Sequence, residues 1–205
     1  MPRRSLLFVA QMTQPQTEPQ TGLIAGTWNV DPLHSQIMVG VRHFSVANLR
    51  AKFPKASGGL RVDAGNPLQS SFEVEIDTRA VTTGHPAQED FMRSEPWLDA
   101  ENHPGITFRS TAITPTGSGF LIRGDLTLKG VTREIEMPAE FHGVVSDPWG
   151  LRAGFTSQFT VDRRDFGITW NRVFDWGMMA GDELTFTLDV ELAYPDESLA
   201  QKPQA

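Results

Sequence analysis

Apolar and polar residues alternate along most of this chain, and the alternation is most regular between Gly119 and Val145. A period of two is typical of a β-strand that has one buried and one solvated face. The pattern is interrupted at Lys129-Gly130, where the glycine can adopt the positive φ of a tight reversal. The stretch therefore predicts a long β-hairpin with one apolar face.

Shorter segments with the same alternation lie on both sides of this hairpin. They cover residues 27–30, 36–42, 50–63, 72–77, 106–109, 152–161 and 184–192. Together with the hairpin they give about eight strands, without the strand–helix–strand rhythm of a parallel sheet. We predict an all-β fold, an antiparallel barrel of about eight strands that is closed or nearly closed and carries short helical inserts.

Three interruptions of the alternation predict local irregularities. Residues 43–49 predict one short helical turn, and Gly58-Gly59 predicts a bulge in the surrounding strand. Residues 88–93 follow Pro86 and predict a short helix, since proline is tolerated in a first turn. The apolar residues of this insert are Phe91, Met92, Trp97 and Leu98. We expect them to cover one mouth of the barrel.

Composition narrows the possible roles. The chain has 205 residues, a formal net charge of −7 and no cysteine. A nucleic-acid partner is not expected for an acidic chain without a basic block, and disulfides and thiolate sites are excluded. Apolar runs stay below the ~20 residues of a transmembrane helix. The length fits one domain, with residues 26–194 as the barrel and residues 1–25 and 195–205 as disordered ends.

The first residues resemble the start of a signal peptide, with Arg3-Arg4 before an apolar run at residues 6–10. The run is shorter than the ~7–15 residues of an export signal. We therefore expect a cytoplasmic protein, with a periplasmic or secreted location as the alternative. Translation could start at Met1 or at Met12.

The interior of a barrel of this size is either filled by side chains or holds one small ligand. Long strands and small residues at inward positions, such as Gly124 and Ala139, favour a narrow apolar slot that suits an extended hydrocarbon chain. The residues predicted to line it are Val39, Val41, Phe72, Val74, Ile76, Phe108, Ile122, Gly124, Leu126, Ile135, Met137, Phe141, Phe155, Phe159, Phe186 and Leu188.

Several motifs, in this order, resemble the YceI-like, polyisoprenoid-binding family. They include Trp28-Asn-Val-Asp-Pro-Leu-His-Ser35, His103-Pro-Gly-Ile-Thr-Phe-Arg-Ser110, Gly124-Asp-Leu-Thr-Leu-Lys-Gly-Val-Thr132 and Asp162-Arg-Arg-Asp-Phe-Gly-Ile168. The resemblance spans about residues 26–193. It implies an extended, lipocalin-like antiparallel barrel that holds an isoprenoid or another long-chain lipid in its bore. It also implies a possible homodimer.

Polar residues offer candidates for a lipid head group but little for catalysis. The five histidines show neither HxH nor HExxH spacing, so we expect no metal site. A GxSxG nucleophile elbow is also missing. The head-group candidates are His34, His43, Arg163 and Trp170. For Arg163 the alternative is a salt bridge that locks the long connection 162–182, and for Trp170 it is packing of that connection against the barrel.

We therefore expect a non-catalytic protein that binds or carries a quinone, a polyprenol or a polyprenyl phosphate and needs no cofactor. One alternative is a fatty acid or another acyl lipid as the ligand. A second is an enzyme that holds its lipid in the same tunnel, and a third is a stress-linked structural or interaction protein with a filled bore.

Overall fold

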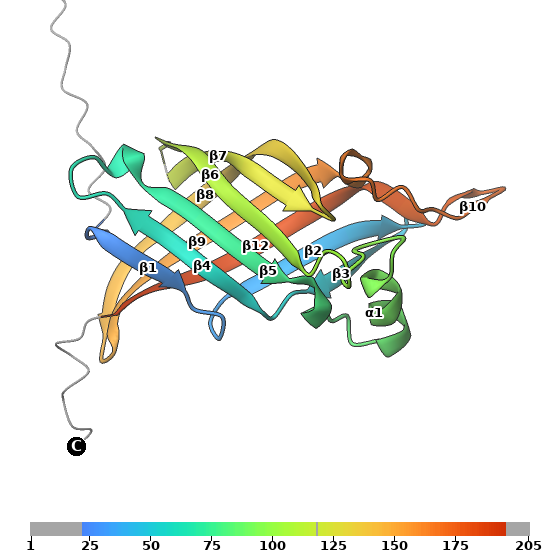
Figure 1. Cartoon of the computed structure of the whole chain (residues 1–205), viewed down its shortest axis with the longest axis horizontal. Helices are drawn as coiled ribbons and strands as arrows, with labels where there is room; N and C mark the ends of the chain where they lie inside the picture. The colour runs from blue at the N-terminus through green and yellow to red at the C-terminus, as the bar shows by residue number, and fades with distance from the viewer. Residues whose placement is uncertain (1–21, 118, 196–205) are drawn as a thin grey trace, which may run out of the picture.

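The structure is a computed structural model that describes residues 22–117 and 119–195. Its main feature is one antiparallel sheet that closes on itself (Figure 1). The strands of this sheet are β1 (Gly26–Val30), β2 (Gln36–His43), β3 (Ala47–Lys52), β4 (Ala56–Val62), β5 (Ser71–Asp77), β6 (Gly105–Pro115), β7 (Gly119–Leu128), β8 (Val131–Asp147), β9 (Gly150–Asp162) and β12 (Ala180–Pro195). The predicted leader (1–25) and tail (195–205) lie largely outside the described residues.

Strand β12 closes the barrel. One edge of β12 pairs with β9 from Glu183 to Pro195. The other edge pairs first with β2 and then with β1, so that β1 and β2 act as one long strand interrupted by residues 31–35. In the same way, β3 and β4 form the next strand, interrupted by residues 53–55. Counted like this, the sheet is a closed eight-stranded antiparallel barrel, which confirms the predicted fold.

The hairpin predicted around Lys129-Gly130 is present as β7 and β8, paired from Gly119↔Glu140 to Leu128↔Val131. Lys129 and Gly130 both have positive φ, at 49° and 73°. Two consecutive positive φ values are the geometry of a two-residue turn that matches the twist of the flanking strands.

Two local predictions were wrong. Residues 43–49 form no helical turn, because Phe44 and Ser45 adopt positive φ (48° and 58°) and reverse the chain between β2 and β3. The strand predicted at 50–63 breaks at residues 53–55 and not at the glycine pair. Gly58 and Gly59 lie inside β4, where a Cβ would come within 2.2 and 2.0 Å of backbone carbonyl oxygens on the neighbouring strands. The glycines therefore permit close strand approach without interrupting the strand.

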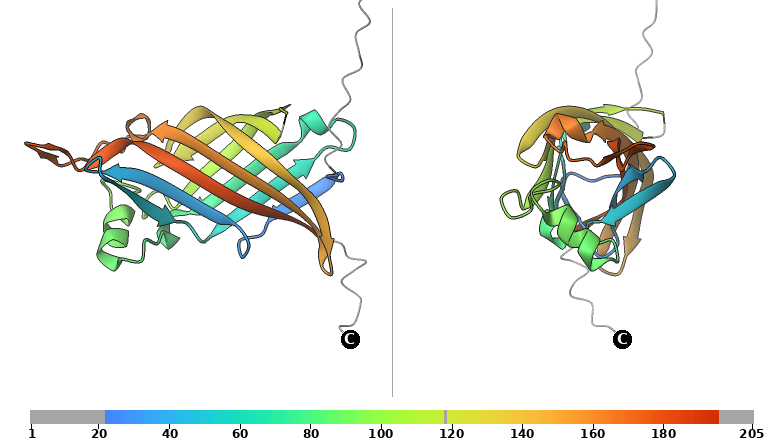
Figure 2. Two further views of the ribbon diagram at one scale, coloured as in Figure 1. Left: turned by 180° about the vertical axis from the view of Figure 1, so that it is seen from behind. Right: turned by 90° about the vertical axis from the view of Figure 1, so that its right-hand side faces the viewer.

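The two ends of the barrel carry different connections (Figures 1 and 2). At one end, which we call the closed end, lie two long inserts, residues 78–104 and 163–179. The first contains the 3₁₀ turn Thr78–Ala80 and the predicted helix, α1 (Pro86–Arg93); the second contains the 3₁₀ turn Arg163–Phe166 and a small hairpin, β10 (Val173–Phe174) with β11 (Gly177–Met178).

At the other end, the open end, short connections join β4 to β5, β6 to β7 and β8 to β9, and the first of them holds the 3₁₀ turn Pro67–Gln69. Among the helices that the structure describes, none is long and apolar enough to cross a membrane.

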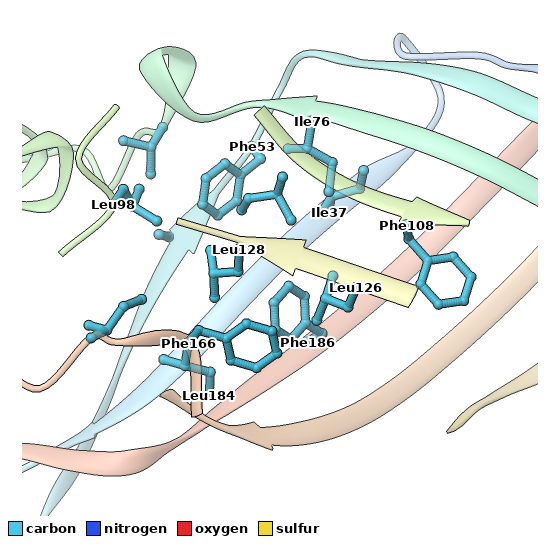
Figure 3. Packing of buried hydrophobic residues seen from close by; sticks show 14 of the residues in the cluster. Ile37, Phe53, Ile76, Leu98, Phe108, Leu126, Leu128, Phe166, Leu184 and Phe186 are labelled. Carbon is cyan, nitrogen blue, oxygen red and sulfur yellow. The ribbon is translucent and has the colours of Figure 1, made fainter. Parts of the chain in front are cut away.

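The buried side chains form two clusters, and the larger one extends from the closed end along the bore to Ile122, Met137 and Ala139. The larger cluster fills the closed end, where Phe53, Leu98, Phe166 and Leu184 gather between the strands and the inserts (Figure 3). The smaller cluster includes Trp28, which is fully buried, and packs against one side of the wall near the open end. Trp97 and Leu98 are buried in the closed-end core, so the first insert covers a mouth of the barrel, as predicted.

Candidate functional site

The bore contains a wide cavity of about 730 Å³ that extends inward from the open end. Most of its lining comes from the strands, whose alternate side chains point inward. The turns at the open end add Leu68 and Thr116 at the mouth. The lining residues are Leu23, Leu60, Val62, Leu68, Ser70, Phe72, Ile113, Thr114, Pro115, Thr116, Phe120, Ile122, Met137, Ala139, Phe155, Thr156, Ser157, Leu188, Val190 and Leu192.

The chemistry of this lining is apolar and uncharged. Its polar members all carry hydroxyl groups: Ser70, Thr114, Thr116, Thr156 and Ser157. Of the residues that the structure describes around this cavity, none bears a charge. The Oγ of Ser157 is buried and has no hydrogen-bond partner among the described residues. The cavity therefore suits a hydrocarbon chain and supplies hydroxyl groups but no counter-ion.

Midway along the barrel the bore narrows. A void of about 40 Å³ lies between the two ends, and Phe186 separates it from the closed end. The ring of Phe186 stacks on that of Phe159, with centroids 4.8 Å apart and planes 3° from parallel. Ile37 and Phe108 also border this void and belong to the closed-end core (Figure 3). The stacked rings divide the bore into a wide and a narrow chamber.

The narrow chamber, of about 180 Å³, lies at the closed end beneath α1. Aromatic rings from both long inserts meet there: the Trp170 ring lies 4.7 Å from that of Phe91 and 6.0 Å from that of Trp97 between centroids. Arg42 and Arg50 also border this chamber, at positions of β2 and β3 that alternate outward. The inserts thus act as an aromatic lid.

The predicted lining residues fall into three groups along the bore. Those at the wide cavity are Phe72, Ile122, Met137, Phe155 and Leu188. Those at the central void are Val74, Ile76, Phe108, Leu126 and Phe159. Those at the narrow chamber are Val39, Val41 and Phe186. These positions alternate as the sequence indicated, so period two identified the inner face of each strand.

Gly124, Ile135 and Phe141 are not found among the lining residues of the three cavities. Gly124 lies behind Phe108, and a Cβ there would be 2.3 Å from the Arg109 carbonyl oxygen. Ile135 packs against the closed-end core. Phe141 lies against the ring of Phe155, with centroids 5.0 Å apart. These residues face inward but support the lining without reaching the free space.

The four head-group candidates are dispersed. His43 and Trp170 border the narrow chamber. His34 lies on the turn between β1 and β2, where its Nδ1 is 3.0 Å from an oxygen of Asp31 and its side chain is 56% exposed. Arg163 is buried in the closed-end core. The fold brings none of the four to the wide cavity.

Arg163 locks the second long insert. Its Nε donates to the carbonyl oxygen of Gly181 at 2.8 Å, its Nη1 to those of Ile168 and Trp170 at 2.6 and 2.8 Å, and its Nη2 to Asp182 at 3.2 Å. Burial lowers the pKa of the guanidinium, and the carboxylates of Asp182 and Asp162 act against that shift. With these donors occupied inside the protein, Arg163 has the structural role that was the alternative to head-group binding.

His34 belongs to a charged cluster outside the bore. One ligand atom each from Asp31, His34 and Glu191 lies within 4.8 Å of the others. Arg152 lies 3.8 Å from Asp31 and 3.7 Å from Glu191, and so supplies positive charge to the same group. Partial burial acts to raise the pKa of Asp31, but hydrogen bonds from His34 and two backbone amides outweigh it and lower that pKa. The hydrogen bond to Asp31 raises the pKa of His34.

Sequence reasoning missed several lining residues at the open end. Leu60, Val62 and Leu192 share the inward phase of residues that were predicted, and a consistent use of the alternation finds them. Ser70, Thr114 and Thr116 sit at strand ends and turns, where alternation stops. No pattern in the sequence distinguishes these hydroxyl groups from ordinary surface residues.

Comparison with known proteins gives consistent matches. The sequence model of the YceI-like domain matches residues 28–192. A UPF0312 protein of Vibrio cholerae is 37% identical over 137 residues, which cover 66% of this chain and 72% of that protein.

Two solved structures share the fold. Burkholderia cenocepacia BcnA is similar with a TM-score of 0.68 at 23% identity, covering 79% of this chain and 98% of BcnA. A domain of Saccharophagus degradans, described as polyisoprenoid binding, has a TM-score of 0.63 at 14% identity and covers 82% of this chain and 98% of that domain. At these identities the two structures establish the fold alone.

Proposed function

The chain belongs to the YceI-like family, and on that basis we propose that its bore binds and carries a long-chain isoprenoid lipid, such as a quinone or a polyprenol, without changing it chemically. The observation that carries this proposal is the wide cavity of about 730 Å³, which is open at one end and lined by apolar and hydroxyl-bearing residues. Its volume lies within the roughly 300–1,000 Å³ of typical ligand sites. No cofactor is part of this function.

The energetics of burial support a hydrocarbon ligand. Each buried CH₂ group contributes about 0.8 kcal/mol, so one five-carbon isoprene unit contributes roughly 3–4 kcal/mol before ordering costs. Four units contribute roughly 12–16 kcal/mol gross, which is comparable to the ~4–15 kcal/mol that association costs. Retention then depends on the fit of the chain to the cavity. The free space in the bore favours a bound ligand over the structural alternative, in which side chains fill the bore.

Mass spectrometry of the organic extract of freshly purified protein tests this function. We expect an isoprenoid at near-equal stoichiometry to the protein. A saturated acyl chain in its place would favour the fatty-acid alternative, and a chemically altered lipid that accumulates with time would favour the enzyme. A protein that yields no lipid and takes up no added quinone or polyprenol would contradict the proposal.

A matched pair of variants on β8 locates the ligand. Ala139 is 6% exposed and lines the wide cavity, whereas its neighbour Glu140 is exposed and points outward. We expect Ala139→Trp to fill the cavity and to lower lipid occupancy by about tenfold, since the indole replaces several buried CH₂ groups. Glu140→Trp adds the same group to the outside and should leave occupancy unchanged. Equal occupancy in both variants would place the lipid elsewhere.

A further inference from the structure

Large apolar side chains are exposed at both ends of the barrel, and those at the open end lie on the segments around the mouth of the wide cavity. Trp149 is 64% exposed and Val145 is 65% exposed, both in or beside the turn between β8 and β9. Leu68, in the turn after β4, is 48% exposed, and Ile24, before β1, is 46% exposed. These segments lie at the same end of the barrel (Figure 1). We call the four residues the apolar rim.

The segments that carry the apolar rim are almost free of charge. Residues 22–30, 63–70, 113–121 and 143–151 contain two charged residues, Asp63 and Asp147. The carboxylate of Asp147 accepts a hydrogen bond from Nε of Arg152 at 2.8 Å. At the closed end, by contrast, the segments 78–104 and 162–182 contain seven charged residues each. In a chain with a net charge of −7, the open end is therefore the part whose transfer out of water costs least.

We propose that the apolar rim docks the open end onto a lipid bilayer, so that the ligand passes between the bilayer and the wide cavity. This inference rests on the proposed function, because a hydrocarbon ligand resides in lipid and its exposure to water during transfer is unfavourable. Tryptophan and leucine side chains insert readily at the boundary between lipid head groups and acyl chains.

The shape and charge of the open end favour a lipid surface over a second copy of the chain. The rim residues lie on separate turns around the hollow mouth of the cavity, and so do not form the continuous, closely packed patch of a stable dimer interface. Because the rim is nearly uncharged, its docking does not depend on anionic lipids. Binding should therefore occur on vesicles of phosphatidylcholine alone and should persist when salt is raised.

The closed end provides a matched control. Trp176, between β10 and β11, is 67% exposed, which is as much as Trp149. Unlike Trp149, it lies in an aromatic group with Phe44 and Phe174, whose ring centroids are 4.7 and 5.0 Å from its own. Arg172 precedes this hairpin, and Asp175 lies in its turn beside Trp176. Trp149→Ser and Trp176→Ser therefore remove equally exposed indoles from opposite ends of the barrel.

The experiment measures co-sedimentation of the full chain with phosphatidylcholine vesicles, at about 0.05 and 0.5 M salt. We expect Trp149→Ser to lower the vesicle partition coefficient by roughly tenfold, since about half of the surface of the indole ring would no longer be buried in the bilayer. Leu68→Ser should lower it by a smaller factor, and Trp176→Ser by less than about twofold. The expected binding changes little with salt. Thermal unfolding of each variant checks that it remains folded.

Lipid uptake separates docking from binding in the bore. Trp149→Ser should take up quinone from detergent solution to the wild-type level but should acquire it more slowly from vesicles. If the chain binds vesicles through Trp149 but no lipid is found in its bore, the result supports docking and contradicts the proposed function.

The docking proposal would be overturned if the wild-type chain did not bind vesicles, or if Trp176→Ser lowered vesicle binding as much as Trp149→Ser. It would also be overturned if Trp149→Ser lost the uptake of quinone from detergent. The fourth contrary result is a dimer in sedimentation that Trp149→Ser abolishes while the vesicle binding of that variant stays unchanged. The last result would assign the open end to a second copy.

Discussion

The closed and open ends are built from the same strands, but one is filled and the other is hollow. At the closed end, Phe53, Leu98 and Phe166 pack between the wall and two long inserts, and a cavity of about 180 Å³ is left. At the open end, short turns contribute no such side chains, and a cavity of about 730 Å³ is left. The strands thus determine the wall of the bore, whereas the lengths of the connections determine which end is closed.

Removing the hydrogen bonds of Arg163 at the closed end should have the largest effect on stability. Arg163→Met removes the four hydrogen bonds of the buried guanidinium and leaves three backbone carbonyl oxygens without their donor. We expect a loss of about 3–5 kcal/mol in the free energy of unfolding, as when one partner of a buried charged pair is removed. Urea unfolding measures it.

The neighbour of Arg163 serves as the control. Arg164 is 56% exposed and pairs at the surface with Asp162 and with Asp182, so Arg164→Ala should cost at most about 1 kcal/mol. Equal losses in the two variants would mean that the buried network does not hold the second insert in place.

Removing the barrier between the two chambers should have the next largest effect. Phe186 is 1% exposed and stacks on Phe159. Phe186→Ala should lower the free energy of unfolding by about 3 kcal/mol, at the lower end of the usual range because cavities already adjoin the ring. It should also join the chambers and admit quinones with more isoprene units than the wild type accepts.

Phe120→Ala sharpens this comparison, because Phe120 is half-buried and lines the wide cavity. Phe120→Ala should lower the free energy of unfolding clearly less than Phe186→Ala. It should not increase the length of the longest quinone that the protein accepts. A quinone series of increasing chain length, measured by competition, checks both variants. If the longest accepted chain is the same in Phe186→Ala and the wild type, the stacked rings do not limit the ligand.

The smallest expected effect concerns His34, which lies on the outside of the wall between the two ends. Pairing with Asp31 raises the pKa of His34 above 6.5, so its contribution to stability is present below that pH and is lost as the pH rises through the folded-state pKa. The pKa of Asp31 is lowered, so its contribution is lost as the pH falls through that value. The pair therefore stabilises the fold at mildly acidic pH.

His34→Gln should remove a small part of the difference between the urea midpoints at about pH 5.5 and pH 8. His85→Gln, at the start of α1, replaces an exposed histidine whose side chain makes no capping hydrogen bond, and it should leave that difference as it is. An unchanged midpoint difference in His34→Gln would show that the pair contributes nothing measurable.

Much of the bore could be predicted because alternation along a strand translates directly into inside and outside. Phe72, Met137 and Leu188 were identified in this way and line the wide cavity. Alternation could not distinguish a side chain that reaches the free space from one that supports it, which is why Gly124 and Phe141 were included. That distinction depends on the curvature of the sheet and on the neighbours across strands, neither of which is local in sequence.

The polar candidates were less predictable for the same reason. Arg163 and Arg164 are adjacent and chemically identical. The side chain of Arg163 is nevertheless buried and donates four hydrogen bonds, whereas that of Arg164 is at the surface. The backbone conformation of Phe44 and Ser45 was also missed, since residues other than glycine rarely adopt positive φ. Both outcomes depend on how the second insert and the turn after β2 meet at the closed end.

The antiparallel barrel, the inward face of each strand and the similarity to a family could all be predicted from the amino-acid sequence, because these properties follow from local periodicity and from the order of motifs. The tertiary structure decided which end of the bore is open, where the stacked rings divide it and which charged groups are buried. Those properties depend on contacts between residues far apart in the chain, such as Arg163 with Gly181 and Phe159 with Phe186, and no local pattern encodes such contacts.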